Sequence, residues 1–213
     1  MATEVDHNDS ARRSSPLGRP GGVIGLFGGS FNPIHNAHLA LARQLREKAQ
    51  LDEVWLMVSP QNPLKQQGDL LGDEERLAMA RAAVKDEPGI VVCDYEMHMP
   101  RPSYTWNTLQ ALSHDYPDRE FVLMIGGDNW LSFDRWYRHE DILKNYRVVV
   151  YPRREAAVDN LPMVDGAQVS LVEAELIDIS STDIRRRIRE GRSIRKLVPR
   201  AVADIIKRNG YYA

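Results

Sequence analysis

The stretch VIGLFGGSFNPIHNAHLALARQL, residues 23–45, decides the fold because it passes from a strand pattern to a helix pattern within a few residues. Residues 23–27 form a short and largely apolar run, which is typical of a buried strand. From Leu39 onward, apolar residues recur at the spacing of an α-helix. A strand followed at once by a helix is the repeating unit of an α/β protein.

The junction between the two patterns carries two glycines and two histidines. Gly28 and Gly29 follow the strand, and glycine lets a backbone come close to a ligand. His35 and His38 share one face of the expected helix and can reach the same ligand. The pair can be read as surface residues, as zinc ligands or as donors to phosphate oxygens. Cys93 has no CxxC partner and no HExxH motif is present, which argues against zinc. The two glycines and the free N–H groups of a helix start favour binding of phosphate.

Length and composition indicate one soluble globular domain. The chain has 213 residues, 43% of them hydrophobic and 27% charged, with a net charge of −2. This charge gives no general attraction to nucleic acid or to a membrane surface, and no apolar stretch approaches the ~20 residues that span a bilayer. A single cysteine fits a reducing cytoplasm. We expect a disordered N-terminal tail at 1–21 and one domain at 22–213, with a small helical part from about 180 to 213.

Strand-like runs alternate with helix-like segments along the rest of the chain. The pattern predicts strands at 23–27, 54–58, 90–94, 121–125, 147–151 and 168–172, and helices at 37–49, 73–86, 105–115, 138–144, 181–190 and 199–208. Such alternation, with strands that are apolar along almost their whole length, predicts a parallel sheet covered by helices on both faces.

Polar residues gather where four of these strands should end. The clusters are Gly28-Gly29, residues 59–65, Gly126-Gly127-Asp128 and residues 151–154. In an open α/β sheet, ligands bind outside the carboxyl ends of the strands, so we expect the site at this edge.

A second candidate for phosphate binding is the segment 179–185, which reads Ile-Ser-Ser-Thr-Asp-Ile-Arg. Its hydroxyl residues can simply cap the helix that follows, yet the same geometry points N–H groups and hydroxyls at an anion. Arg185 can add a forked, charge-assisted contact. Asp183 departs from a purely cationic anion site, although a carboxylate also favours a helix N-terminus. The chain has neither a GxxxxGK[ST] motif nor a GxGxxG motif after the first strand, which argues against P-loop and dehydrogenase types of nucleotide binding.

Taken together, these motifs resemble a known family. The segment 28–39 is similar to the signature of the nucleotidyltransferase superfamily, and 179–185 to its second triphosphate motif. Further matches are Pro63-x-Lys65, Pro102-Ser103-Tyr104-Thr105, Gly126-x-Asp128 and Phe133-x-x-Trp136-Tyr137, and with them the chain resembles the bacterial nicotinate-nucleotide adenylyltransferases over nearly all of 22–210. The resemblance implies a Rossmann-like, three-layer fold of the nucleotidyltransferase type. It also implies adenylyl transfer from ATP to nicotinate mononucleotide, with Mg²⁺ that travels on ATP and is held by phosphates and water.

The same resemblance assigns roles to individual residues. It implies that His35, His38 and Lys65 are catalytic. ATP would contact Gly28, Gly29, Ser30, Phe31, His38, Gly126, Asp128, Ser180, Ser181, Thr182 and Arg185, and the nicotinate nucleotide would contact Asn62, Lys65, Tyr104, Thr105, Trp136 and Arg153. Arg101 is an alternative to Arg153 as the cation for the nicotinate carboxylate, and no residue is assigned as a metal ligand.

The chain departs from the family pattern at three positions of the first motif. Ser30 replaces a commoner threonine, Asn32 replaces an aspartate, and Ala37 replaces a glycine next to the second histidine. The alternatives that stay open are nicotinamide mononucleotide or phosphopantetheine as the acceptor, and a nucleotide-binding regulator without catalysis. Assembly into a homo-oligomer is also left open.

Overall fold

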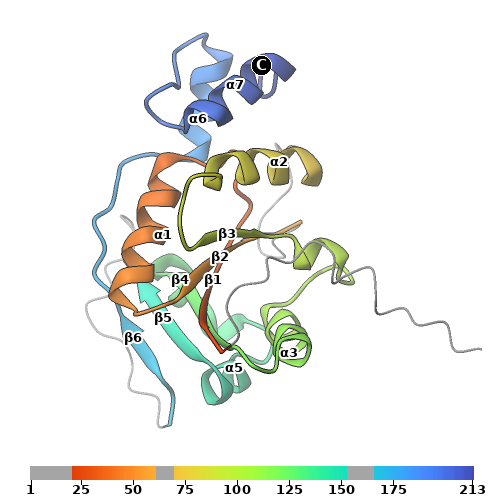
Figure 1. Cartoon of the computed structure of the whole chain (residues 1–213), viewed down its shortest axis with the longest axis vertical. Helices are drawn as coiled ribbons and strands as arrows, with labels where there is room; N and C mark the ends of the chain where they lie inside the picture. Colours follow the sequence, from red (N-terminus) through yellow and green to blue (C-terminus); the bar gives the residue numbers. More distant parts are fainter. Residues whose placement is uncertain (1–20, 61–69, 153–165) are drawn as a thin grey trace, which may run out of the picture.

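A parallel sheet forms the centre of the computed structural model, which describes residues 21–60, 70–152 and 166–213 (Figure 1). Within these residues the strands are β1 (Val23–Gly29), β2 (Glu53–Val58), β3 (Ile90–Cys93), β4 (Glu120–Gly126), β5 (Arg147–Tyr151) and β6 (Val169–Leu171). Their order across the sheet is β3-β2-β1-β4-β5-β6, and every neighbouring pair is parallel. The predicted parallel α/β fold is confirmed.

The helices follow the predicted segments closely. They are α1 (Asn36–Lys48), α2 (Asp73–Val84), α3 (Thr105–Asp115), α5 (His139–Asn145), α6 (Ser181–Arg189) and α7 (Arg200–Asn209). Their ends, like those of the strands, differ from the predicted ends by no more than about two residues. The short helix α4 (Gly127–Trp130) and the 3₁₀ helices η2 (Tyr95–His98) and η3 (Phe133–Arg135) were not predicted, because so few residues carry no hydrophobic period.

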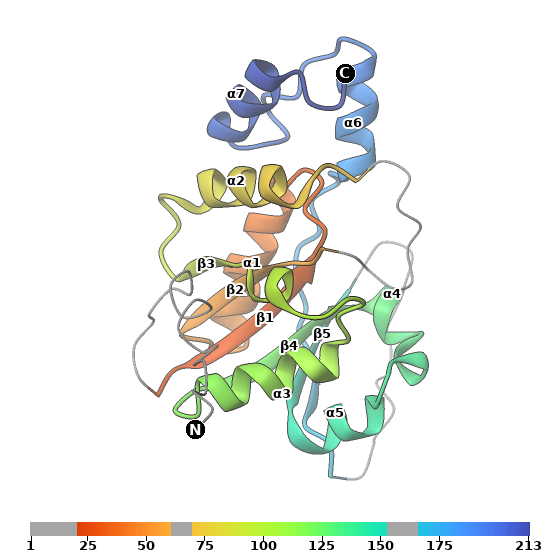
Figure 2. The same ribbon diagram turned by 90° about the vertical axis from the view of Figure 1, so that its right-hand side faces the viewer.

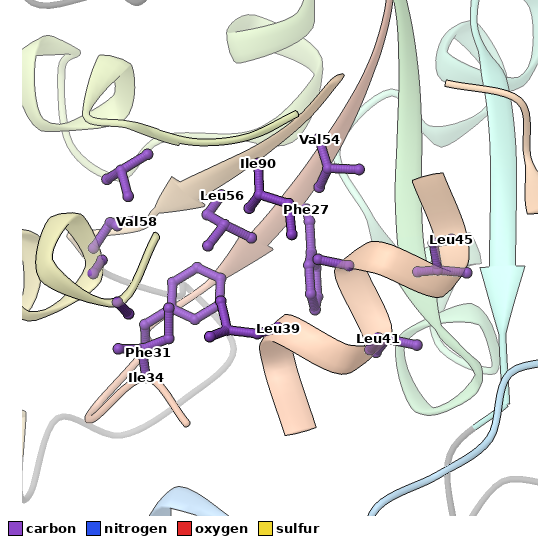
Figure 3. Packing of buried hydrophobic residues seen from close by; sticks show 14 of the residues in the cluster. Phe27, Phe31, Ile34, Leu39, Leu41, Leu45, Val54, Leu56, Val58 and Ile90 are labelled. Carbon is purple, nitrogen blue, oxygen red and sulfur yellow. The ribbon is translucent and has the colours of Figure 1, made fainter. Parts of the chain in front are cut away.

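Two hydrophobic clusters flank the sheet and explain why its strands are apolar throughout. Neighbouring residues of a strand point to opposite faces, so Phe27 packs in one cluster and Leu26 in the other. The first cluster lies under α1 and α2, where Figure 3 shows Phe27, Leu39 and Leu56 packed together. The second cluster lies under α3 and α5 on the opposite face (Figure 2). Both faces are therefore buried, which fixes the three-layer architecture.

The order of the strands creates a crevice at one edge of the sheet. β1 lies between β2 and β4. The chain therefore adds β2 and β3 on one side of β1, and then β4, β5 and β6 on the other side. The carboxyl ends of β1 and β4 thus flank the point where the strand order reverses, which is where ligands bind in open α/β sheets.

The helices α6 and α7 share the core of the first face. Figure 2 shows them above α2, and five buried residues of this part belong to the cluster of α1 and α2: Ile184, Ile194, Val198, Val202 and Ile206. None of the helices in the described segments combines the length and the apolarity that crossing a bilayer requires.

A buried arginine ties the edge of the sheet to α2. The side chain of Arg76 is fully buried and donates to the carbonyl oxygens of Ser30 (2.7 Å), Ser59 (2.9 Å) and Leu71 (2.9 Å). It also pairs with Asp73, and burial lowers its pKa. Arg76 thereby joins the segments that follow β1 and β2 to the start of α2.

Replacing Arg76 with methionine should lower the free energy of unfolding by about 3 kcal/mol, because three carbonyl groups lose a charged donor. Urea denaturation of the two proteins measures this difference. The matched control is Arg200→Met on α7, where the arginine side chain is 97% exposed and its loss should cost less than about 0.5 kcal/mol. Equal stability of the two variants would contradict the role of Arg76.

Candidate active site

A cleft of about 1060 Å³ opens at the carboxyl edge of the sheet, beside the ends of β1 and β4. The predicted site residues that line it are Gly28, Gly29, Ser30, Phe31, His35, His38, Tyr104, Thr105, Asp128, Trp136, Ser180, Ser181, Thr182 and Arg185. Gly126 ends β4 and is not among the lining residues. Asn62, Lys65 and Arg153 lie outside the described residues. Segments far apart in sequence thus meet at one cavity, as expected from their places at strand and helix ends.

The two glycines of the first motif serve different purposes. A Cβ atom added to Gly28 would meet nothing within 4 Å, so this position gives a ligand open access to the backbone. A Cβ atom on Gly29 would lie 3.0 Å from the ring of Phe31. Phe31 itself is only 2% exposed and has a positive φ of 45°, so its ring is chiefly a packing element beneath the cleft. Ala37 lies in the regular helix α1 and has no positive φ, so alanine in place of glycine causes no backbone strain here.

The two histidines are fixed against each other at the start of α1. His35 is the N-cap residue of the helix, and its main-chain N–H donates to Nδ1 of His38 at 3.3 Å. The rings stack with centroids 3.6 Å apart and an angle of 15° between their planes. A neutral ring that accepts a hydrogen bond at Nδ1 carries its hydrogen on Nε2, so His38 offers Nε2–H as its donor. Since His35 is 4% exposed and both histidines line the cleft, they are not ordinary surface residues.

Edge contacts with two phenylalanines hold the ring of His38 further in place. Its centroid lies 5.0 Å from that of Phe31 and 6.3 Å from that of Phe27.

Among the described residues, no group of three His, Cys, Asp or Glu side chains could hold a metal ion. Cys93 is buried at the end of β3, where burial raises its pKa to about 12.

The start of α6 lines the cleft and also forms hydrogen bonds with the loop between β1 and α1, residues 30–35, which we call the β1–α1 loop. Ser180 caps α6 by accepting the N–H of Asp183 at 3.1 Å, as the capping interpretation predicted. Ser181 Oγ donates to the carbonyl of Pro33, and Arg185 Nη1 donates to the carbonyl of Asn32, each at 2.9 Å. The sequence motif gave no sign of these contacts, because they join residues about 150 positions apart.

The acidic residue of this motif is neutralised on its own helix. Asp183 forms ion pairs with Arg187, at 2.7 Å, and with Arg186, and these partners hold the pKa of its carboxyl below the usual value. Asp183 is not among the residues that line the cleft. Its charge is therefore no obstacle to an anion beside Ser181 and Arg185.

An aromatic wall borders the other part of the cleft. Trp136 lies 5.3 Å from Phe133, which stacks at 5.2 Å on Trp130. Tyr104, the N-cap residue of α3, contacts Tyr137 at 5.1 Å between ring centroids. The first turn of α3 presents backbone N–H groups here, since within the described residues no side chain caps this helix. Flat apolar surfaces beside N–H donors suit an aromatic ring that bears an anionic substituent.

Comparison with known proteins identifies the family. A family model described as cytidylyltransferase-like matches residues 26–187. A Bacteroides fragilis protein named "Probable nicotinate-nucleotide adenylyltransferase" is 47% identical, over 84% of this chain and 88% of its own length. A Bacteroides thetaiotaomicron protein of the same name is 45% identical, over 86% of this chain and 90% of its own. The chain belongs to the nicotinate-nucleotide adenylyltransferases. It is therefore an enzyme of the nucleotidyltransferase class.

A solved structure shares the fold of this adenylyltransferase. It is the nicotinic acid mononucleotide adenylyltransferase of Plasmodium falciparum, described as complexed with NaAD. The likeness covers 89% of this chain and 97% of that one, with a TM-score of 0.72 and 19% sequence identity. At this level of identity the comparison supports the Rossmann-like architecture.

The cleft of the adenylyltransferase also contains residues that the sequence did not single out. Glu96 is 8% exposed and accepts hydrogen bonds from Ser59 Oγ at 2.7 Å and Thr108 Oγ1 at 2.9 Å, and burial raises its pKa. It fastens the end of β2 to α3. Its only sequence signal was a carboxylate shortly after a strand, which is too common to be informative.

Arg101 and Arg135 differ in their relation to the cleft. Arg101 does not line the cleft and pairs with Asp73 at 2.6 Å. Arg135 lines the cleft next to Trp136. Its position just before the predicted stacking residue is a signal that sequence reasoning could have used.

Proposed function

We propose that the enzyme transfers the adenylyl group of ATP to nicotinate mononucleotide, which gives nicotinate adenine dinucleotide and pyrophosphate. The observation that carries this proposal is the joining, in one cleft, of the His35–His38 pair with the aromatic wall at Trp136. A phosphate site and a ring site in one cavity suit a reaction that links two nucleotides. We expect the enzyme to work in the cytoplasm.

In the proposed reaction a phosphate oxygen of the mononucleotide attacks the α-phosphorus of ATP in line with the leaving group. The new phosphorus–oxygen bond forms as the bond to the β-phosphate oxygen breaks, and pyrophosphate leaves with the electron pair. The attacking phosphate is already a nucleophile, so no covalent enzyme intermediate is required. Catalysis then depends on positioning and on donors such as His38 Nε2–H that stabilise charge on the α-phosphate.

The remaining contacts of ATP follow from the places of the lining residues. We propose that Ser181, Thr182 and Arg185 bind the β- and γ-phosphates, and that Asp128 accepts hydrogen bonds from a ribose. Mg²⁺ would be held by the phosphate oxygens and water, and would neutralise part of their charge. Lys65 stays a predicted phosphate contact.

For the acceptor, we propose that Trp136 stacks on the nicotinate ring. The backbone N–H groups at Tyr104 and Thr105 would bind its carboxylate. Arg135 would add the positive charge that favours the acid over the amide. Asn62 and Arg153 stay predicted contacts of the same nucleotide.

Pyrophosphate release by the purified protein tests the proposed function. With ATP and Mg²⁺ present, release should be fastest with nicotinate mononucleotide and much slower with nicotinamide mononucleotide or phosphopantetheine. A preference for either of those acceptors would overturn the substrate assignment. Binding of ATP without release from any acceptor would favour a regulator that lacks catalysis.

Replacing His38 with alanine should lower kcat by about a hundred- to a thousandfold, the usual cost of removing one donor to a transition-state oxygen. Thermal melting should show that the variant still folds. His114→Ala provides the control, because the His114 side chain is 84% exposed on α3, outside the cleft. A kcat for His38→Ala near that of the control would remove His38 from catalysis.

Replacing Arg135 with glutamine should reduce the preference for the acid acceptor. We expect kcat/KM for nicotinate mononucleotide to fall about tenfold, the effect of losing one charge-assisted contact, while the value for the nicotinamide nucleotide changes little. Arg138→Gln is the control, because Arg138 pairs with Asp141 and does not line the cleft. Equal losses with both acceptors would show that Arg135 does not read the carboxylate.

A further inference from the structure

The β1–α1 loop and the residue after it form hydrogen bonds with four places in the segment 181–212. Two are the contacts of Ser181 and Arg185 described above. The third is the backbone of residues 196–197, since the main-chain N–H of Asn36 donates to the carbonyl of Leu197 at 2.9 Å and its side chain donates to that of Lys196 at 3.1 Å. The fourth is Tyr212. The shape of the loop therefore depends on a part of the chain that follows it by about 150 residues or more.

Tyr212 makes its contact with a side chain that is central to the loop. Its hydroxyl donates to Asn32 Oδ1 at 2.8 Å, and the same oxygen accepts the N–H of Leu71 at 3.2 Å. Asn32 is 5% exposed and its carbonyl accepts Arg185, so its side chain and its main chain are both fixed from outside the loop. Burial raises the pKa of Tyr212, which keeps the hydroxyl protonated as a donor.

The position of Asn32 explains why this bond matters for the nucleotide. Asn32 lines the cleft and lies three residues before His35, whose main chain sets the ring of His38. The carbonyl of Asn32 also accepts a hydrogen bond from Arg185, the side chain proposed to bind the β- and γ-phosphates. A shift of Asn32 would thus disturb the donors for the triphosphate. In the described part of the chain, no hydrogen bond or ring contact joins Tyr212 to Trp136 or to the start of α3.

We propose that Tyr212 is a positioning residue for ATP, whose hydroxyl holds Asn32 and thereby orders the β1–α1 loop before the nucleotide binds. The assignment rests on the proposed function for its choice of ligand. A loop that is already ordered binds its ligand more tightly, because binding then loses no conformational entropy in ordering the loop. Tyr212 itself touches no reacting atom in this scheme.

Tyr212→Phe removes the hydroxyl and keeps the ring. We expect KM for ATP, and its Kd by calorimetry, to rise about three- to tenfold, the range given by loss of one hydrogen bond. KM for the mononucleotide should stay the same, and kcat should change less than KM. Hydrogen-exchange mass spectrometry should show faster exchange in peptides that span residues 28–38.

Tyr211→Phe is the matched control, because the two tyrosines are adjacent and the Tyr211 hydroxyl has no hydrogen bond to Asn32. It should leave exchange and ATP affinity unchanged. In an Asn32→Ala background, Tyr212→Phe should have no further effect on ATP affinity, because its acceptor is gone.

Two results would overturn the proposal. One is a lower melting temperature of Tyr212→Phe with unchanged ATP affinity and exchange, which would make the hydroxyl a general stabiliser. The other is an equal loss of affinity for both substrates. If the unaltered enzyme released no pyrophosphate with any acceptor, the proposed function would fail, while the exchange and calorimetry comparisons would still decide the role of Tyr212.

Discussion

Residues of other segments around the cleft donate hydrogen bonds to the main chain of the β1–α1 loop, and this pairing ties the loop to the rest of the structure. Buried backbone groups must be paired, because leaving one unpaired costs about as much as a lost hydrogen bond. Within the loop, the carbonyl of Ser30 accepts Arg76 and that of Asn32 accepts Arg185, and just before it the carbonyl of Gly29, the last residue of β1, accepts the N–H of Ser59 at 3.0 Å. These partners come from the end of β2, from α2 and from α6. Burying the loop and assembling the cleft are consequently one event.

The sheet makes that event possible, because it brings the required segments to one edge. Parallel strands end together, and the reversal of strand order at β1 and β4 leaves room between the segments that follow them. On one side of this space two stacked imidazoles lie at a helix start, and on the other an aromatic wall lies beside a second helix start. Donors fixed in advance are what a phosphate transfer requires when the nucleophile needs no activation.

Local patterns in the sequence predicted most of this architecture. The strands could be predicted because both faces are buried, and most of the cleft because it lies at strand and helix ends. The exceptions share a physical cause. Arg76 stands in the charged run Asp73-Glu74-Glu75-Arg76, which resembles a solvated helix face, and only the fold reveals the three carbonyl groups that surround it. Tyr212 donates to Asn32, a partner 180 positions away that no local period encodes. The roles of Asn62, Lys65 and Arg153 stay predictions.

The hydrogen bond between Tyr212 and Asn32 spans 180 positions of sequence, and this separation has a consequence for the growing chain. At a synthesis rate of about 5–20 residues per second, the loop is synthesised roughly ten to forty seconds before its tyrosine partner. β1 to β5 could already have paired by then, yet Asn32 would still lack both Tyr212 and Arg185. A partly synthesised chain would therefore form the strands β1 to β5 before the contacts of Arg185 and Tyr212 fix Asn32.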